Sequence, residues 1–141
     1  MSHGEWESAM KLTVTRSPFH RLIGLELTRA SKDEVELRVR WRPEFRRSDG
    51  SDWYHGGVIS ALIDIAGDYA IAARLGRWVP TIDLRVDYLR PALEGDLTAV
   101  ARAVKVGRTV GVADVELRDA GGAVVAVGRA AYSTSGRDRA S

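Results

Sequence analysis

Apolar and charged residues alternate along several short segments of the chain. Residues 34–41 (EVELRVRW) and 81–89 (TIDLRVDYL) carry apolar side chains at every second position, with mainly charged ones between them. This period of two is typical of strands with one buried face. Residues 25–30 and three later segments, LTAVARAVKV, VGVADVELR and AVVAVGRAAY, favour four more strands. The short sequences EGD, GRT and DAGG separate the last four strands. The pattern therefore predicts six strands.

A different pattern covers residues 57–75, which are apolar almost throughout and rich in alanine, leucine and isoleucine. This run is too long for a strand, and as a helix it would be about 28 Å long. Because it is apolar on nearly every side, we expect it to be buried. Two strands, one long helix and four closely connected strands predict an α+β fold, in which an antiparallel sheet wraps around the helix.

The residues before the first strand indicate shorter helices. Residues 5–14 show a weak helical period. In SPFHRLIG, Ser17 suits an N-cap, Pro18 the first helical position and Gly24 the exit of a two-turn helix.

The length of 141 residues fits one domain. We place it over residues 1–141, with residues 1–16 as an N-terminal extension and the polar residues 135–141 as a flexible tail.

Composition and charge exclude several classes of function. There is no cysteine, which removes disulfides and cysteine nucleophiles and is compatible with the cytoplasm, where we expect the protein. The first sixteen residues lack the apolar stretch of a signal peptide, and no segment has the length of a membrane span. The net charge is only +2, with both signs interspersed, so we expect neither nucleic acid nor a membrane as a partner.

Two carboxylates interrupt the apolar helix, Asp64 and Asp68, one turn apart. An unpaired buried charge is costly, so each needs a partner or a cavity. Both could bond to the backbone or pair with an arginine such as Arg85, and we keep this interpretation for Asp68. Asp64 differs because of what precedes it.

Gly56 and Gly57 open the predicted helix, where backbone N–H groups are free and the helix dipole is positive. Glycines leave these donors accessible, as an oxyanion hole requires. Alone, the pair also fits a tight bend. Together with Asp64 in an apolar groove, it favours a site in which a carboxylate acts on an acyl group as general base or nucleophile.

Other catalytic arrangements find less support. His55 is a rival for catalysis, although a histidine beside glycines also fits a hydrogen-bonded structural role. No metal-ligand spacing such as HExxH is present, so we expect no metal. No Gly-x-Ser-x-Gly sequence surrounds Ser60, which disfavours a serine hydrolase.

Four segments in order, SPFHRLIG, HGGVISALIDIAGDYA, TIDLRVDYLRPALEGD and VVAVGRAAY, resemble the hotdog-fold acyl-CoA thioesterases of the phenylacetate-degradation type. The resemblance covers about residues 17–134. It implies the hotdog fold, a sheet around a central helix, and hydrolysis of acyl-CoA thioesters. It also implies that Asp64 is the catalytic carboxylate, that Gly56 is the main oxyanion donor, and that the Thr81 hydroxyl helps to position the attacking water.

The resemblance also suggests substrate contacts, among which we include His55 and Gly57. Asp49 stands about where the family often has Asn or Gln against the thioester, yet a carboxylate donates no hydrogen bond unless protonated. The loop of residues 42–54 is long enough to bind a ligand, and its Trp53 and Tyr54 could line an acyl pocket.

Coenzyme A carries phosphates, so basic side chains are expected near the groove. Arg90, Lys105 and Arg108 are candidates, and the resemblance favours Arg108, although each could be a solvated surface charge. The resemblance implies no redox cofactor, with coenzyme A present only as part of the substrate. Two alternatives stay open: a non-catalytic acyl-CoA sensor, and a dehydratase or hydratase on an acyl carrier, which would use a catalytic histidine in a different motif.

The distance between the start of the helix and Asp64 predicts that the active site is shared between two chains. If the helix begins at Gly57, Asp64 lies about 10 Å further along its axis, too far for one thioester carbon to contact both groups. We therefore expect a two-fold homodimer with antiparallel helices, as in the resembled family, so that Asp64 of one copy faces Gly56 of the other. We also expect two such dimers to pair into a dimer of dimers, although no pattern in the sequence distinguishes this tetramer from the dimer.

Overall fold

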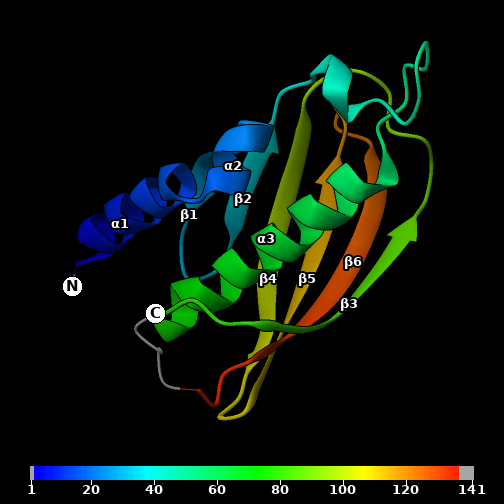
Figure 1. The fold of residues 1–141 in the computed structure, drawn as a ribbon. Helices are drawn as coiled ribbons and strands as arrows, with labels where there is room; N and C mark the ends of the chain where they lie inside the picture. The colour runs from blue at the N-terminus through cyan, green and yellow to red at the C-terminus, as the bar shows by residue number, and fades with distance from the viewer. Residues whose placement is uncertain (1, 137–141) are drawn as a thin grey trace.

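The long helix α3 lies across the concave face of a six-stranded antiparallel sheet in the computed structural model, which describes residues 2–136 (Figure 1). The helices are α1 (His3–Arg16), α2 (Pro18–Ile23), the 3-10 turn η1 (Pro43–Phe45) and α3 (Gly56–Leu75). The strands are β1 (Glu26–Ala30), β2 (Val35–Val39), β3 (Thr81–Tyr88), β4 (Leu97–Val106), β5 (Val110–Arg118) and β6 (Val124–Ser133). Their order in the sheet is β1-β2-β4-β5-β6-β3.

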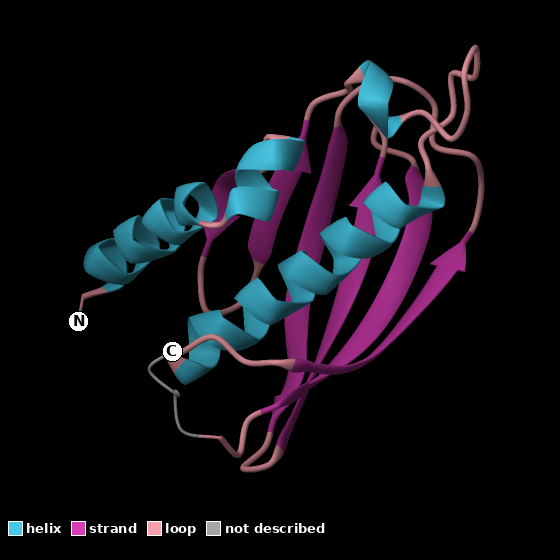
Figure 2. Cartoon of the chain, in the orientation of Figure 1, coloured by secondary structure: helices cyan, strands magenta, loops and turns pink. Residues whose placement is uncertain are grey.

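The predicted α+β fold is confirmed, with all six strands and the central helix. All helices lie on one side of the sheet (Figure 2). The helix α3 begins at Gly56, one residue earlier than the apolar run suggested. None of the helices in residues 2–136 has the length and apolarity needed to span a membrane.

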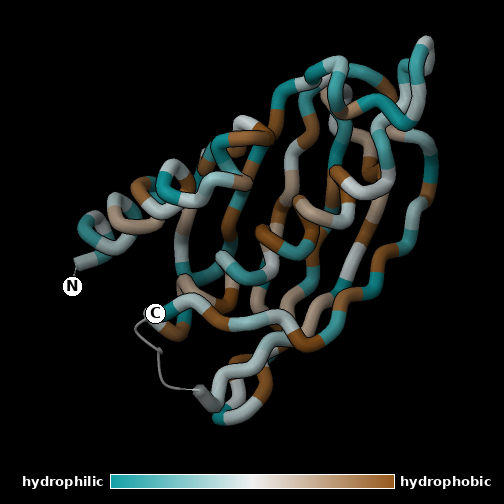
Figure 3. Tube along the Cα trace, viewed as in Figure 1, coloured by the Kyte–Doolittle hydropathy of each residue, from teal (hydrophilic) through white to brown (hydrophobic). Residues whose placement is uncertain are grey.

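The core lies between α3 and the sheet. Leu62, Ile63 and Ile71 of α3 have no exposed surface, and Leu97 and Leu117 are equally buried on the strands beneath them. Hydrophobic residues recur along both layers (Figure 3). Complete burial of each such side chain contributes about 1.5–3 kcal/mol, which holds the helix firmly on the sheet.

Capping residues set the limits of the two N-terminal helices. Ser2 and Glu5 make a reciprocal capping box at the start of α1, so this helix is longer than its weak period indicated. The predicted limits of α2 are confirmed: the Ser17 side chain accepts from the His20 N–H, and Gly24 ends the helix with φ of 66°, a conformation that favours glycine. Residues 137–141 of the expected tail lie outside the described part of the chain.

The strand β3 is an edge of the sheet and pairs only with β6. Its alternating pattern predicted one buried face, but Ile82 is 57% exposed and Tyr88 is 52% exposed, while Leu84 and Val86 are half-buried. The difference arises because α3 covers the centre of the sheet better than this edge. A long edge strand with exposed apolar residues is a ready template for pairing with another chain.

The charged residues between the apolar ones lie on the outer face of the sheet. There they form cross-strand ion pairs, such as Arg129 with Asp114 at 2.6 Å and Arg38 with Glu26 at 2.6 Å. These pairs lower the pKa of Asp114 and of Glu26, chiefly through the arginine hydrogen bonds. The interspersed charges of the sequence are therefore the polar face of the strands.

Candidate active site

The start of α3 leaves one backbone donor free. His55 caps the helix, and its ring Nδ1 accepts the Gly57 N–H at 2.8 Å. The Val58 N–H donates to the His55 carbonyl at 3.1 Å, and the His55 N–H donates to the Phe45 carbonyl at 2.7 Å. The Gly56 N–H, in contrast, meets no acceptor within residues 2–136. It is an uncommitted donor at the positive end of a helix, as expected for an oxyanion hole.

His55 therefore has the structural role that the sequence allowed. Because a backbone N–H can only donate, Nδ1 must be the unprotonated ring nitrogen, and a neutral His55 carries its proton on Nε2. In this tautomer Nε2 is a donor, not a base.

Asp64 lies two turns into α3 and is half-buried. Its Oδ1 accepts a hydrogen bond from the Thr81 hydroxyl at 2.7 Å, and its backbone carbonyl accepts one from the Tyr132 hydroxyl at 2.7 Å. A Cβ on Gly67 would overlap this Tyr132 hydroxyl, so glycine allows the helix to approach β6 closely. Two strands thus hold Asp64, β3 through the carboxylate and β6 through the backbone carbonyl.

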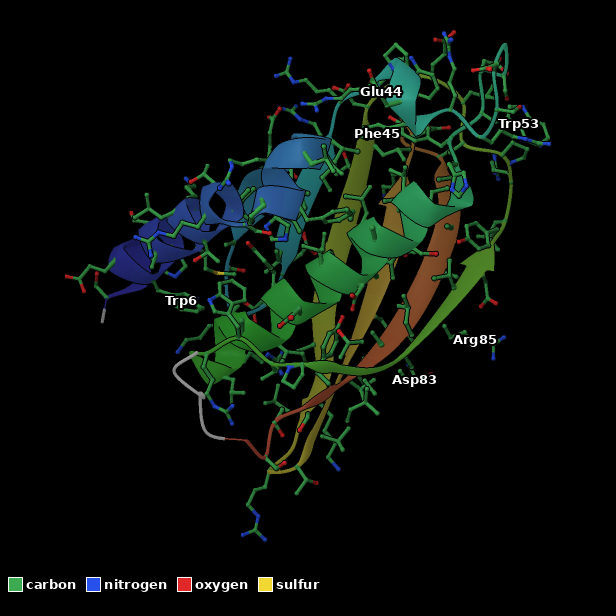
Figure 4. All side chains as sticks on the ribbon, viewed as in Figure 1. Trp6, Glu44, Phe45, Trp53, Asp83 and Arg85 are labelled. Carbon is green, nitrogen blue, oxygen red and sulfur yellow. The ribbon has the colours of Figure 1, made fainter. Side chains whose placement is uncertain are left out.

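Asp68 lies on the next turn, where its Oδ1 accepts the Val79 N–H at 3.3 Å. Burial raises the pKa of Asp68 to about 7, and the negative charge of Asp64 adds to the shift. The backbone partner proposed for Asp68 is confirmed. Pairing with Arg85 is wrong: Arg85 contacts Asp87 at 3.3 Å and lies on the outer side of β3 (Figure 4), because side chains alternate between the faces of the strand.

Two hollows flank the start of α3. The first has a volume of about 670 Å³ and a mainly apolar wall that includes Phe19, Leu22 and Ile23 of α2 with Val58 and Ala61 of α3. It also reaches His55 and Gly57, the residues on either side of Gly56 in the chain. A hydrocarbon chain attached to a carbonyl at Gly56 could enter it.

The second hollow has a volume of about 560 Å³ and lies on the other side of Gly56, bounded by Trp53, Tyr88 and the basic residues Arg47 and Arg90. The guanidinium of Arg47 stacks 4.8 Å from the Trp53 ring centroid. Tyr54 also contributes, but it is only 4% exposed and its hydroxyl donates to the Gly95 carbonyl at 2.6 Å. Tyr54 is thus mainly a core residue, and the two arginines at this hollow suit a negatively charged group.

The remaining predicted site residues are dispersed in one chain. Asp49 lies in an exposed turn closed by the Ser51 N–H and the Ser48 carbonyl, and it lines neither hollow. Arg90 lies beside Gly56, whereas Arg108 is on the β4–β5 turn, at the end of the sheet where Gly111 meets Ile71 of α3. Gly56 and Asp64 are eight residues apart on the helix, about 12 Å along its axis. One chain therefore does not bring both groups to one reacting atom.

The structure adds one residue that the sequence did not single out, Tyr88, and gives Ser60, which the sequence considered only as a serine nucleophile, a contact with it. The Tyr88 hydroxyl donates to the Gly56 carbonyl at 2.9 Å and lies 2.5 Å from the Ser60 hydroxyl. Tyr88 was assigned to the apolar face of a strand, and nothing in a single sequence reveals that the end of β3 meets the start of α3. Within residues 2–136, no group of three His, Asp or Glu side chains is arranged to hold a metal ion.

Comparison with known proteins assigns the family. The sequence pattern of the thioesterase superfamily matches residues 54–126, which include the start of α3, Asp64 and Thr81. The chain belongs to this superfamily. The enzyme class expected from the sequence, a thioesterase, is thereby confirmed.

Individual relatives agree with this assignment. The medium/long-chain acyl-CoA thioesterase YigI of Escherichia coli is 33% identical over 146 residues, covering 89% of this chain and 94% of its own. A Halobacterium salinarum protein named as an esterase is 40% identical over 121 residues, covering 78% of this chain and 80% of its own. The crystal structure of a Shewanella oneidensis protein related to the thioesterase superfamily has a TM-score of 0.83 and 29% identity, covering 94% of this chain and 99% of that one.

Proposed function

We propose that this protein hydrolyses acyl-CoA thioesters, as an enzyme of the phenylacetate-degradation type within its superfamily. The observation that carries the proposal is the stripe of Gly56 and Asp64 on one face of α3. The first offers a free N–H at the helix start, and the second is a carboxylate held by the Thr81 hydroxyl. A donor for a developing oxyanion and a positioned carboxylate are what acyl transfer requires.

In the proposed reaction the thioester carbonyl oxygen accepts the Gly56 N–H. Asp64 then takes a proton from a water molecule whose oxygen attacks the carbonyl carbon, and negative charge collects on the oxygen held by Gly56. Collapse of the tetrahedral intermediate breaks the C–S bond, and the thiolate of coenzyme A leaves with the proton. Asp64 could instead attack directly and form an anhydride that water hydrolyses. In both routes the Thr81 hydroxyl fixes the orientation of the carboxylate.

The 12 Å between Gly56 and Asp64 supports a site shared between two chains. If two copies of α3 pack antiparallel about a two-fold axis, Asp64 of each copy faces Gly56 of the other, and two identical sites result. The exposed edge strand β3 supports the same assembly, since it has unpaired backbone groups and exposed apolar side chains. Further pairing into a dimer of dimers stays a prediction.

The two hollows suggest how the substrate is divided. We assign the acyl chain to the apolar hollow bounded by Phe19 and Leu22, and this assignment is consistent with the medium- and long-chain esters named for YigI. The phosphates of coenzyme A are assigned to Arg90 and to Arg108 of the partner subunit, since antiparallel packing would carry the β4–β5 turn toward the other copy's helix start. Asp49 would contact the substrate only in such a dimer.

The position of His55 argues against a dehydratase. Its Nδ1 already accepts the Gly57 N–H, so the histidine lacks a free basic nitrogen in its neutral form. A non-catalytic acyl-CoA sensor remains as an outcome of the test.

A thiol-release assay across acyl-CoA esters of increasing chain length, with binding measured in parallel, tests the proposal. We expect turnover that is best with medium or long chains and that falls by at least about a hundredfold in Asp64→Asn, which should still bind the ester. Tight binding without turnover of any ester by the wild-type protein would identify a sensor instead.

A further inference from the structure

The peptide that joins Gly56 to Gly57 is held at both ends. Its N–H donates to Nδ1 of His55 at 2.8 Å, and its carbonyl accepts the Tyr88 hydroxyl at 2.9 Å. It is adjacent to the peptide that carries the free Gly56 N–H. A fixed orientation of the first peptide therefore restricts the direction in which the free donor points.

The hydrogen bonds at Tyr88 have a defined direction. A carbonyl oxygen only accepts, so the single hydroxyl proton of Tyr88 is committed to Gly56. The Ser60 hydroxyl, 2.5 Å from the Tyr88 oxygen, must then be the donor in that pair. The result is a chain from Ser60 to Tyr88 to the Gly56 carbonyl, which links the end of β3 to the first turn of α3.

Tyr88 also lies directly against Gly56. A Cβ built on Gly56 would be 3.4 Å from both Cε1 and the hydroxyl oxygen of the Tyr88 ring. The backbone that follows Tyr88 is anchored to β6, because the Leu89 N–H donates to the Val125 carbonyl at 2.9 Å. Although Tyr88 is 52% exposed, its hydroxyl is thus held by the helix and its backbone by the sheet.

Ser60 occupies the middle of the catalytic stripe. Gly56, Ser60 and Asp64 follow one another at intervals of four residues, on one face of α3. In the proposed antiparallel dimer, Ser60 lies midway between the donor and the carboxylate, and therefore near the two-fold axis. The Ser60–Tyr88 pair would adjoin both shared sites.

We propose that Tyr88, held by Ser60, is a positioning residue that orients the oxyanion donor Gly56. This inference rests on the proposed function, because the donor acts only if a thioester carbonyl binds there. The Tyr88 hydroxyl does not contact the reacting atoms. It stabilises the Gly56–Gly57 peptide. The preceding peptide, which joins His55 to Gly56, carries the N–H that would contact the thioester.

Tyr88→Phe tests this role, since it removes the hydroxyl and keeps the ring against Gly56. We expect kcat for a medium-chain acyl-CoA ester to fall about three- to tenfold, the effect of losing one neutral hydrogen bond, with KM changed less than about twofold. Ser60→Ala should lower kcat in the same direction, and the double variant should be no worse than Tyr88→Phe, because both act through the same carbonyl. Amide hydrogen exchange at Gly57, followed by NMR, should become faster in Tyr88→Phe.

Thr13→Val is the matched control, because it removes a hydroxyl that donates to a helical carbonyl, that of Ala9 at 2.9 Å, on α1 and outside both hollows. It should keep the wild-type kcat. Unchanged kcat in Tyr88→Phe, additive losses in the double variant, or an equal loss in Thr13→Val would overturn the inference. A changed shape of the pH–rate profile in Tyr88→Phe would also overturn it, since the hydroxyl would then be transferring a proton.

These results separate the two proposals. A wild-type protein that turns over no thioester overturns the proposed function, and with it the positioning role. Wild-type turnover with normal kinetics in Tyr88→Phe overturns only the role of Tyr88.

Discussion

The Thr81 hydroxyl donates a hydrogen bond of 2.7 Å to the carboxylate of Asp64, joining the first residue of β3 to the middle of α3. No other side-chain or backbone donor within residues 2–136 contacts this carboxylate. Its second oxygen is therefore available to a water molecule or a thioester. Asp68, one turn further, is instead directed at the Val79 N–H.

Asp64→Asn should retain the fold and lower turnover by about two to four orders of magnitude, because it removes a positioned base at nearly constant volume. Asp68→Asn should cost far less, since an amide oxygen can still accept the Val79 N–H. Steady-state kinetics on one acyl-CoA ester compare the two variants. Equal losses would show that Asp64 is not the chemical residue.

The raised pKa of Asp68 predicts how stability depends on pH. Its pKa is about 7 in the folded chain and 3.8 without the fold, so the folded state binds more protons between these values. The contribution of Asp68 to stability is therefore present at about pH 4 and is lost as the pH rises through 7, by an amount on the order of 4 kcal/mol. Asp68→Asn cannot ionise, so its Tm should exceed that of the wild type increasingly from pH 4.5 to pH 8. A difference in Tm that is independent of pH would contradict this prediction.

Leu22→Glu should weaken binding of long acyl chains, because Leu22 forms part of the apolar hollow and is 69% exposed, so its replacement scarcely affects the core. We expect KM for a long-chain ester to rise about tenfold, with little change for acetyl-CoA. Leu12→Glu is the control, since Leu12 is similarly exposed, at 56%, on α1 and lines no part of the hollow. The same effect on both chain lengths would place the acyl group elsewhere.

Arg108→Ala should raise KM for coenzyme A esters more than it lowers kcat, because a phosphate contact is made equally in the ground and transition states. The effect should disappear with esters of a short thiol that lacks the phosphates. Equal losses on the two kinds of ester would indicate that Arg108 has a structural role.

Mixed dimers test whether the site is shared. Asp64→Asn and a folded, inactive Gly56 variant, such as Gly56→Val, are unfolded together and refolded in equal amounts. Half the dimers should be mixed, each with one site carrying both defects and one carrying neither, so about a quarter of wild-type activity should return. If mixed dimers form and no activity returns, the whole site lies within one subunit.

The fold could be predicted from sequence because its signals are local. The alternation of Val35, Leu37 and Val39 needs no knowledge of the rest of the chain, nor do the Ser17 cap and the Gly24 exit. The side chains around the candidate site were harder to predict: Thr81, beside Asp64, followed only from a family resemblance, and Tyr88, beside Gly56, was not found. Both contacts depend on where the edge strand crosses the helix, which is a property of the packed sheet. The exposure of the apolar side chains of β3 was not predicted for the same reason, since an alternating pattern does not distinguish an edge strand from a central one.

Gly67 touches neither hollow, yet its missing side chain allows the Tyr132 hydroxyl to reach the Asp64 carbonyl. A library of all single substitutions, selected for activity, should therefore be depleted at position 67 as severely as at Asp64. A second substitution that shortens Tyr132 should restore activity to some of the depleted variants, because a smaller residue there makes room for a side chain on the helix. A map of mutational tolerance would thus extend the functional site from Asp64 through the helix to Tyr132 of β6, which lines neither hollow.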